Sequence, residues 1–341
     1  MASHLEKKRF LADKKELLNL YKKGNLFELG KLALEVKEKI HGKRYYYTIN
    51  RHINYTNVCI INCKFCGYYK KPKEKGAYTL SVEEILEKLL SEDSLREVHI
   101  VGGVNPELPY SYYVNLIKKI SLAKPHLRIR AFTCVEIDFL SKISGKKVRE
   151  VLLELKEAGL SSLPGGGAEV FSERIRRELY PNKISSERWI EITKTAHQIG
   201  LKSNATLLFG HLETEEEVIE HLLKLREIQE ETGGFEAFVP LPFIPKNTKL
   251  SYLSPPSAQR ILKTIAISRL ILDNFFYIKA YWVFLGIGLA QTALLWGADH
   301  FHGTVIEEKI SEAMKQESVV RLSPQEIEKI IKEVEGEPVL I

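Results

Sequence analysis

Short apolar runs and amphipathic helical stretches alternate along the chain after residue 44. The runs have the length of buried strands, and their intervals of about 30 to 40 residues are those of parallel βα units. Eight such units predict an α/β protein built as a complete (β/α)8 barrel of the TIM type, with a half-open six-stranded barrel as the alternative. The expected strands are 45–49, 97–101, 128–132, 161–163, 202–208, 237–240, 278–283 and a weak one at 304–305.

Helical patterns flank the predicted barrel on both sides. Leu17, Leu20 and Tyr21 keep helical spacing, and Gly24 interrupts the pattern before a second helix. We therefore expect an N-terminal helical extension over residues 1–44, the barrel over 45–310, and a helical tail over 311–341 packed on the barrel. Within the barrel, the capping boxes Ser81-x-x-Glu84 and Thr214-x-x-Glu217 predict two helix starts.

Three cysteines, Cys59, Cys63 and Cys66, have the spacing C-x3-C-x2-C. Three thiolates can hold three irons of a [4Fe–4S] cluster and leave the fourth iron open to a small-molecule ligand. A structural zinc site and a closed electron-transfer cluster are the alternatives, and both need a fourth ligand. The remaining cysteine, Cys134, lies in an apolar stretch that has the pattern of a strand end, and we expect it to be a buried thiol.

Other motifs also follow the predicted strands, at the end where a barrel gathers its chemistry. Gly165-Gly166-Gly167 lacks a following Lys-Ser/Thr, so it is not a phosphate-binding P-loop. After the first strand comes the cysteine loop, and the next four strands are followed by Gly102-Gly103, Cys134-Val135-Glu136, the segment 164–169 and the segment 209–213.

Composition restricts the class of protein. The net charge of +6 is mild for 341 residues, and the basic clusters lack interleaved aromatic residues, so nucleic-acid binding is not expected. With three of the four cysteines assigned to one cluster, a disulfide framework is excluded and a reducing cytoplasmic location is indicated. The N-terminus is charged, unlike a signal peptide. The most apolar run, 277–296, contains Lys279 and Gln291, so no membrane span is expected.

The cysteine motif, with Phe65 before its last cysteine, resembles that of radical S-adenosylmethionine (SAM) enzymes. Longer segments, 50–59, 162–169 and 230–235, resemble the futalosine-pathway enzymes of menaquinone biosynthesis. Within that group, the segments 98–103, 131–137, 203–206, 209–214 and 278–282 are similar to the aminofutalosine synthase family. The resemblance runs from Tyr45 to Ile310.

This resemblance implies a [4Fe–4S] cluster and SAM, which the family consumes as a co-substrate. One electron from the cluster cleaves SAM to a 5′-deoxyadenosyl radical, which adds to the enol-ether double bond of 3-[(1-carboxyvinyl)oxy]benzoate. Rearrangement and decarboxylation then give 6-amino-6-deoxyfutalosine and L-methionine. An electron donor such as flavodoxin or ferredoxin is implied as well.

The resemblance also implies which residues contact SAM. Gly102 and Gly103 would let the backbone approach the methionine amino group, and Phe65 would lie near adenine. The remaining candidates are carboxylates, an amide and an arginine: Glu136, Glu169, Asn204 and Arg188, the last in preference to Arg176.

Because the implied substrate carries two carboxylates, basic side chains are expected beside the cluster. The candidates are Arg51, His52, Lys279 and Arg269, each with an ordinary barrel salt bridge as the alternative. His52 and His211 are also candidates for moving protons, although a lone histidine is more often structural. His300 and His302 form an H-x-H pair with no evident partner ligand, and we expect them on a surface loop rather than in a second metal site.

Two other functions remain open on the sequence. The radical cyclase of the same pathway, which acts on dehypoxanthine futalosine, shares the cysteine motif and the triple glycine but would release 5′-deoxyadenosine. An iron–sulfur electron carrier without turnover is the alternative of another class, and it would need no large polar cavity.

Overall fold

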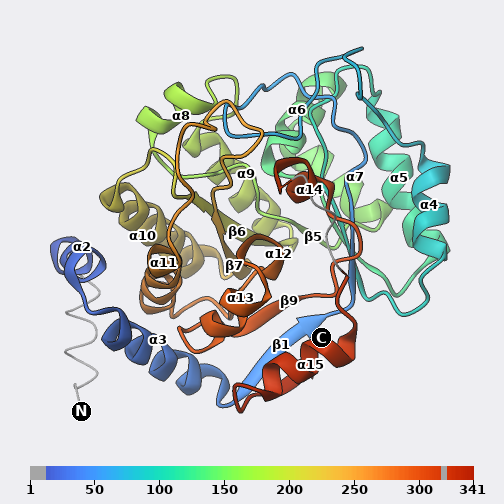
Figure 1. Ribbon diagram of the computed structural model, residues 1–341. Coiled ribbons are helices and arrows are strands. Elements are labelled where there is room, and N and C mark those ends of the chain that lie inside the picture. The colour runs from blue at the N-terminus through green and yellow to red at the C-terminus, as the bar shows by residue number, and fades with distance from the viewer. Residues whose placement is uncertain (1–12, 316–320) are drawn as a thin grey trace.

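The computed structural model describes residues 13–315 and 321–341. Two helices precede the barrel, α2 (Lys14–Lys23) and α3 (Leu26–His41), and they lie along its outside (Figure 1). The predicted break is confirmed, because Gly24 ends α2 and the Asn25 side chain caps α3. The part of the predicted extension before residue 13 lies outside the described residues.

Seven parallel strands form the main sheet, in the order β2-β3-β4-β5-β6-β7-β8. They are β2 (Asn50–Ile53), β3 (Glu97–Ile100), β4 (Arg128–Ala131), β5 (Ser162–Leu163), β6 (Lys202–Phe209), β7 (Phe235–Pro242) and β8 (Tyr277–Ile278). A second sheet has the order β10-β1-β9, with β1 (Arg44–Thr48), β9 (His300–Gly303) and β10 (Glu337–Leu340). The predicted α/β class with parallel strand–helix units is confirmed, although the main sheet has seven strands and not the eight expected for a complete barrel.

The strands run in a closed circuit. β1 leads directly into β2, β9 pairs with β1 in parallel, and a single bridge between Lys279 and His300 links β9 to the end of β8. The backbone N–H of Ala280 donates to His300 O at 2.8 Å, and that of Asp299 donates to Ile278 O at 3.1 Å. The junction beside β8 therefore rests on a few hydrogen bonds, whereas β6 and β7 pair over seven registered positions.

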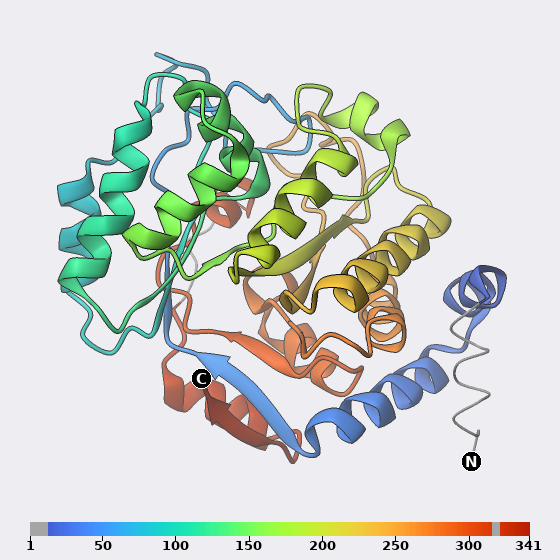
Figure 2. The ribbon, with the colours of Figure 1, turned by 180° about the vertical axis from the view of Figure 1, so that it is seen from behind.

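Helices surround the strands (Figures 1 and 2). The capping boxes of Ser81 and Thr214 are both formed, which confirms the two predicted helix starts. In chain order the helices are α4 (Val82–Leu90), α5 (Tyr110–Ala123), α6 (Cys134–Ser144), α7 (Val148–Ala158), α8 (Glu173–Leu179), α9 (Ser186–Gln198), α10 (Glu215–Thr232), α11 (Ala258–Ile271), α12 (Trp282–Leu285), α13 (Ile287–Leu294), α14 (Lys309–Lys315) and α15 (Pro324–Lys332).

Four predicted element positions differ in the structure. The strand expected over 278–283 ends at Ile278, because α12 begins at Trp282. The weak strand expected at 304–305 lies earlier, at His300–Gly303. Cys134 is the first residue of α6, capped by Thr133, and not a strand end. The C-terminal tail, expected to be helical, also contributes β10, which pairs with β1.

On β3, the side chains that face the barrel interior are polar. In β3 the side chains of Val98 and Ile100 are fully buried in the apolar core, whereas Glu97 and His99 line cavities inside the barrel. This alternation follows from the strand period of two residues. The apolar core therefore sits between strands and helices, and the interior is left for chemistry.

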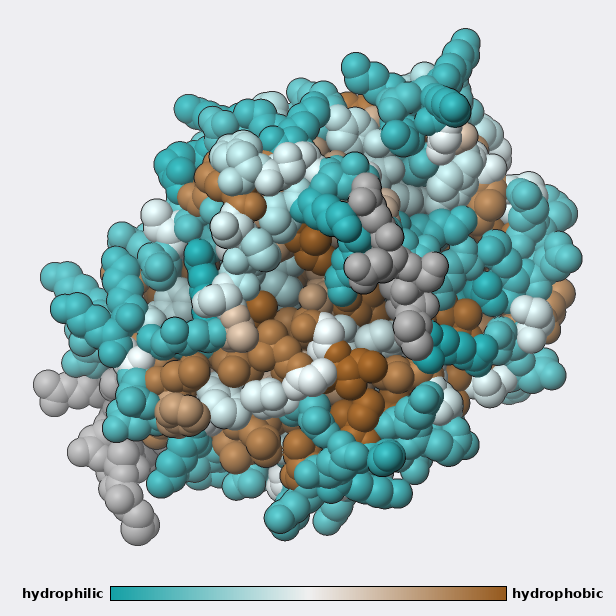
Figure 3. Space-filling view, in the orientation of Figure 1, coloured by the Kyte–Doolittle hydropathy of each residue, from teal (hydrophilic) through white to brown (hydrophobic). Residues whose placement is uncertain are grey.

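An apolar band crosses the molecular face that carries α12 and α13 (Figure 3). Ile287 and Leu295, at the two ends of α13, are exposed apolar side chains. Among the described residues, no helix has both the length and the apolar character that a membrane crossing requires.

Buried His221 predicts an acid-sensitive fold. Its Nδ1 accepts from the Phe171 N–H at 3.1 Å and its Nε2–H donates to Thr206 O at 3.0 Å, so the neutral ring fits and a second proton does not. Burial lowers the pKa of His221 to about 3 from 6.5. Between these values the unfolded chain binds the proton and the native state does not, so stability falls as pH drops from 6.5 towards 3, by up to about 1.4 kcal/mol per pH unit. The free energy of unfolding, measured with denaturant at several pH values, should depend less steeply on pH in His221→Gln than in the wild type. The same pH dependence in both proteins would contradict the assignment.

Candidate active site

A cavity of about 320 Å³ lies at the carboxyl end of the barrel strands. Each strand from β2 to β9 contributes a residue to the cavity wall, either at its end or from the loop that follows it. Examples in strand order are His52, Gly102, Glu136, Gly166, Leu208, Pro242, Tyr281 and His302. This is the end of a barrel at which catalytic groups gather.

Cys59, Cys63 and Cys66 all line this cavity. The loop that carries them is anchored by backbone hydrogen bonds from Cys59 N to Lys70 O (2.9 Å), Ile60 N to Val104 O (3.1 Å) and Lys64 N to Leu179 O (2.8 Å). Because three thiols on one fixed loop face one cavity, the donor set fits a [4Fe–4S] cluster with an open iron.

Cys134 does not line the cavity. It is 1% exposed, and its Sγ lies 3.3 Å from Thr193 Oγ1, between α6 and α9. The prediction of a buried thiol is confirmed. This placement gives no support to a four-thiolate zinc site.

Gly102 and Gly103 line the cavity, and both are tightly packed. A Cβ at Gly103 would lie 2.1 Å from Val58 O and 2.9 Å from Cys59 Cβ, and a Cβ at Gly102 would lie 2.6 Å from the Tyr55 ring. The pair therefore lets β3 end directly against the cysteine loop, in addition to any contact with SAM.

Glu136 is buried in the cavity wall, where it ties two neighbouring loops together. One oxygen accepts from Tyr55 OH (2.7 Å) and Gly102 N (3.2 Å), and the other accepts from Thr133 N (2.7 Å). Burial raises the pKa of Glu136 to about 7. The carboxyl group thus fixes the loop of Gly102 against the start of α6.

Glu169 lines the cavity with an ion-pair partner that the sequence did not reveal. Its backbone has φ +53, and Lys183 Nζ lies 2.5 Å from its Oε1. Burial opposes the charge on Lys183, yet Cys63 and Glu169 raise the lysine pKa above its ordinary value. Lys183 thus brings a positive charge to this part of the cavity wall. Its ammonium nitrogen also lies over the Phe65 ring, 5.1 Å from the ring centroid.

The two arginines proposed for the methionine carboxylate are occupied elsewhere. Arg188 pairs with Asp138 (2.7 Å) and Glu191 (2.8 Å), and Arg176 pairs with Glu173 (2.6 Å). Neither lines the cavity. The cavity wall contains Lys183 and not the arginine that the sequence led us to expect.

Arg269 and His211 also lie outside the cavity wall. Arg269 is fully buried, forms an ion pair with Asp299, and donates to Gly297 O (3.1 Å) and Phe275 O (3.0 Å). The His211 ring contacts its own loop, with Nε2 3.1 Å from Leu208 O and Nδ1 accepting from Leu212 N at 2.7 Å. Both contact sets are structural, and both residues are withdrawn as catalytic candidates.

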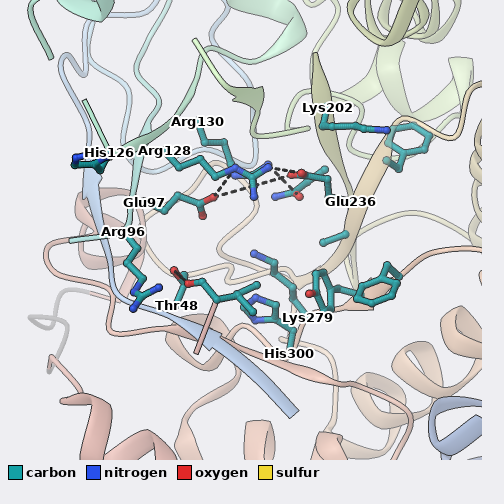
Figure 4. A pocket seen from close by; sticks show the side chains of 16 residues that line it. Thr48, Arg96, Glu97, His126, Arg128, Arg130, Lys202, Glu236, Lys279 and His300 are labelled. Carbon is teal, nitrogen blue, oxygen red and sulfur yellow. Dashed lines mark hydrogen bonds and ion pairs between the residues drawn. The ribbon is translucent and has the colours of Figure 1, made fainter. Parts of the chain in front are cut away.

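A second cavity, of about 540 Å³, opens at the opposite end of the barrel (Figure 4). Arg128 and Arg130 form ion pairs there with Glu97 and Glu236. Lys279 belongs to this cavity, and burial lowers its pKa to about 8. Asn204 lines both cavities and accepts from Arg130 at 3.2 Å.

Lys279 therefore does not face the cysteines, as a substrate-binding residue would. Arg51 is also engaged elsewhere, with Glu307 at 3.1 Å and Lys88 O at 2.8 Å. Of the basic candidates chosen from the sequence, His52 alone lines the cavity that holds the three cysteines.

His52 has histidine neighbours that the sequence did not bring together. His99 lies beside it on β3, in register with it, and His302 reaches the same point from β9. All three rings are buried in the cavity wall. The expectation that His300 and His302 lie on a surface loop is wrong, because both belong to β9 and both rings are buried.

Residues 53–225 match the family model of the radical SAM superfamily, and residues 232–341 match that of the CofH/MqnC C-terminal region. The chain belongs to the radical SAM superfamily. Its cofactors are accordingly a [4Fe–4S] cluster and SAM, and Cys59, Cys63 and Cys66 form a donor set that fits the cluster.

Curated relatives fall into two groups by name. An aminodeoxyfutalosine synthase from Thermus thermophilus is 39% identical over 92% of this chain and 86% of its own length. An aminodeoxyfutalosine synthase from Streptomyces coelicolor is 40% identical over 86% of this chain and 79% of its own length. A 5-amino-6-(D-ribitylamino)uracil–L-tyrosine 4-hydroxyphenyl transferase from Methanococcus aeolicus is 38% identical over 95% of this chain and 93% of its own.

Solved structures share the fold. Methylornithine synthase superposes with a TM-score of 0.78 at 20% identity, covering 98% of this chain and 97% of its own. A maturase of the [FeFe]-hydrogenase superposes with a TM-score of 0.73 at 18% identity, covering 99% of this chain and 76% of its own.

Proposed function

We propose that this enzyme is an aminodeoxyfutalosine synthase of menaquinone biosynthesis, which joins the adenosyl part of SAM to 3-[(1-carboxyvinyl)oxy]benzoate. The products are 6-amino-6-deoxyfutalosine and L-methionine. The observation that carries the proposal is that segments resembling the synthases, 98–103 and 278–282, contribute His99, Gly102, Gly103 and Tyr281 to the wall of the cysteine-bearing cavity. The likeness thus falls on the residues around the reacting molecules, in addition to the overall identity with the synthases.

The chain's own residues divide into a SAM-binding and a substrate-binding part. When bound, the cluster supplies the electron that cleaves SAM. Glu169 and Lys183 offer opposite charges to the ammonium and carboxylate of the methionine part, and Phe65 offers a ring face nearby. Glu136 holds the Gly102 loop that borders this space.

The substrate-binding part is the opposite wall with His52, His99, His302 and Tyr281. Its buried imidazoles and hydroxyl suit a ligand with carboxylate groups, because buried carboxylates need several hydrogen-bond donors. A donor such as flavodoxin or ferredoxin would deliver the electron.

The transferases form a second candidate, because one of them is 38% identical to this chain, against 39% for one of the synthases. The test is an anaerobic assay of the reconstituted enzyme with SAM and either 3-[(1-carboxyvinyl)oxy]benzoate or the pair 5-amino-6-(D-ribitylamino)uracil and L-tyrosine. Mass spectrometry should detect 6-amino-6-deoxyfutalosine from the first mixture. A coupled product from the second mixture alone would assign the chain to the transferases. Dehypoxanthine futalosine is a third substrate to supply, and release of 5′-deoxyadenosine with a cyclised product would indicate the cyclase.

Glu169→Ala should weaken SAM binding by about 10- to 150-fold, because a hydrogen bond to a charged group contributes about 1.5–3 kcal/mol. Glu169→Gln, which keeps the length of the side chain, should weaken it less. Equilibrium binding of SAM to the reconstituted protein measures both. Glu173→Ala, at an exposed glutamate on α8, is the matched control. An unchanged SAM affinity in Glu169→Ala would remove this residue from the site.

A further inference from the structure

Three histidine rings converge at one point of the cavity wall, and each comes from a different strand. The potential ligand atoms of His52 (β2), His99 (β3) and His302 (β9) all lie within 4.8 Å of one another. The ring centroids are 4.6 Å apart for His52–His99 and 5.5 Å apart for the other two pairs. Of the H-x-H pair, His302 therefore gains two possible partner ligands through the fold, whereas His300 lines the other cavity.

The spacing suits a tetrahedral metal ion. Zinc–nitrogen bonds of about 2.0–2.1 Å at tetrahedral angles require nitrogens about 3.3–3.4 Å apart. His52 Nε2 and His302 Nε2 are 3.3 Å apart. The His52 and His99 rings lie nearly parallel, at 10°, with their centroids 4.6 Å apart.

The surroundings orient the rings as metal-bound histidines are oriented. His99 Nε2 donates to Glu97 Oε1 at 2.5 Å, which leaves Nδ1 with a free lone pair. Arg130 holds the other Glu97 oxygen at 2.9 Å (Figure 4). The Tyr281 hydroxyl lies 3.4 Å from His52 Nδ1, and its ring stacks on His302.

The rings also lie within reach of a ligand. His302 Nδ1 has no hydrogen-bond partner in the described part of the chain. All three rings line the same cavity as the cysteines.

We propose that His52, His99 and His302 bind one Zn²⁺ ion, with its fourth position open to the cavity for a carboxylate of the substrate. Three neutral imidazoles with an open position form a donor set typical of reactive zinc sites. Zinc has no redox chemistry of its own, so it can hold an anion beside a one-electron reaction without exchanging electrons with it. Zinc binding stands independently of the proposed function, whereas the carboxylate role rests on it.

The test measures metal content rather than turnover. Anaerobically reconstituted enzyme is equilibrated with Zn²⁺ and desalted, and zinc, iron and sulfide are determined. We expect about one zinc per chain beyond the cluster. His52→Gln and His302→Gln should lose the zinc with iron and sulfide unchanged, and Glu97→Gln should weaken zinc binding by about 10–100-fold. His126→Gln, an exposed histidine at the other end of the barrel, is the matched control.

Titration with Co²⁺ gives a readout that needs no folded variant. Wild-type enzyme should develop the visible bands of four-coordinate Co²⁺, and Zn²⁺ should abolish them. Adding 3-[(1-carboxyvinyl)oxy]benzoate should shift the bands, with no need for catalysis. Absence of zinc and of the cobalt bands in the wild type, or zinc retained in both glutamine variants, would overturn the site. Cobalt bands that do not shift when 3-[(1-carboxyvinyl)oxy]benzoate is added would overturn only the proposed role in binding the substrate carboxylate.

Discussion

Cys63→Ser is expected to abolish cluster assembly and SAM cleavage while the fold persists. Cys63 lies in the middle of the C-x3-C-x2-C loop and lines the cavity with Cys59 and Cys66. A serine hydroxyl is a poor iron ligand, and two thiolates cannot hold a cubane that already leaves one iron open. Iron and sulfide should fall to background, and the circular dichroism of the variant should match that of the wild type.

Cys134→Ser is the matched control for this experiment. Cys134 is also buried, but it contacts Thr193 rather than the cavity. It should keep full cluster content and lose only a modest amount of stability. Normal SAM cleavage by Cys63→Ser would contradict the cluster assignment, and loss of the cluster in Cys134→Ser would revive a four-cysteine centre.

Gly103→Ala is expected to disrupt the cysteine loop with a single methyl group. The new Cβ would lie 2.1 Å from the backbone oxygen of Val58 and 2.9 Å from Cys59 Cβ, and a backbone oxygen cannot rotate away. Either β3 or the loop must shift. We expect a loss of about 3 kcal/mol in the free energy of unfolding, measured with denaturant, and poor cluster retention after reconstitution.

Gly288→Ala controls for the general effect of replacing glycine. Gly288 lies in α13, where an added Cβ would meet open space. Alanine should leave the cluster unchanged and stabilise the helix by up to about 1 kcal/mol. If Gly103→Ala were as stable and as rich in cluster as Gly288→Ala, the close packing of β3 on the cysteine loop would be wrong.

Features that depend on neighbours in the chain were predictable. The cysteine spacing, the capping boxes at Ser81 and Thr214, and the break at Gly24 all follow from interactions within a few residues. Strand positions followed from apolar runs because each strand packs one face on the helices. The error at 278–283 has the same origin, since an apolar run does not show where a buried strand turns into a buried helix.

Charged residues were the least predictable part of the site. Arg188, Arg269 and Lys279 were reasonable choices by type and strand position, yet the fold gives the two arginines carboxylate partners and points Lys279 at the other cavity. Lys183 carried no local signal, because its role comes from proximity to Glu169 and Cys63.

By itself, the sequence determined the cluster ligands, the βα repeat and the family, since these depend on residue types at fixed spacing along the chain. The tertiary structure alone decided the Glu169–Lys183 pair and the meeting of His52, His99 and His302. Strand register and barrel closure set those contacts, and both depend on how β2, β3 and β9 come together across some 250 residues of chain, as the separation of His52 from His302 measures.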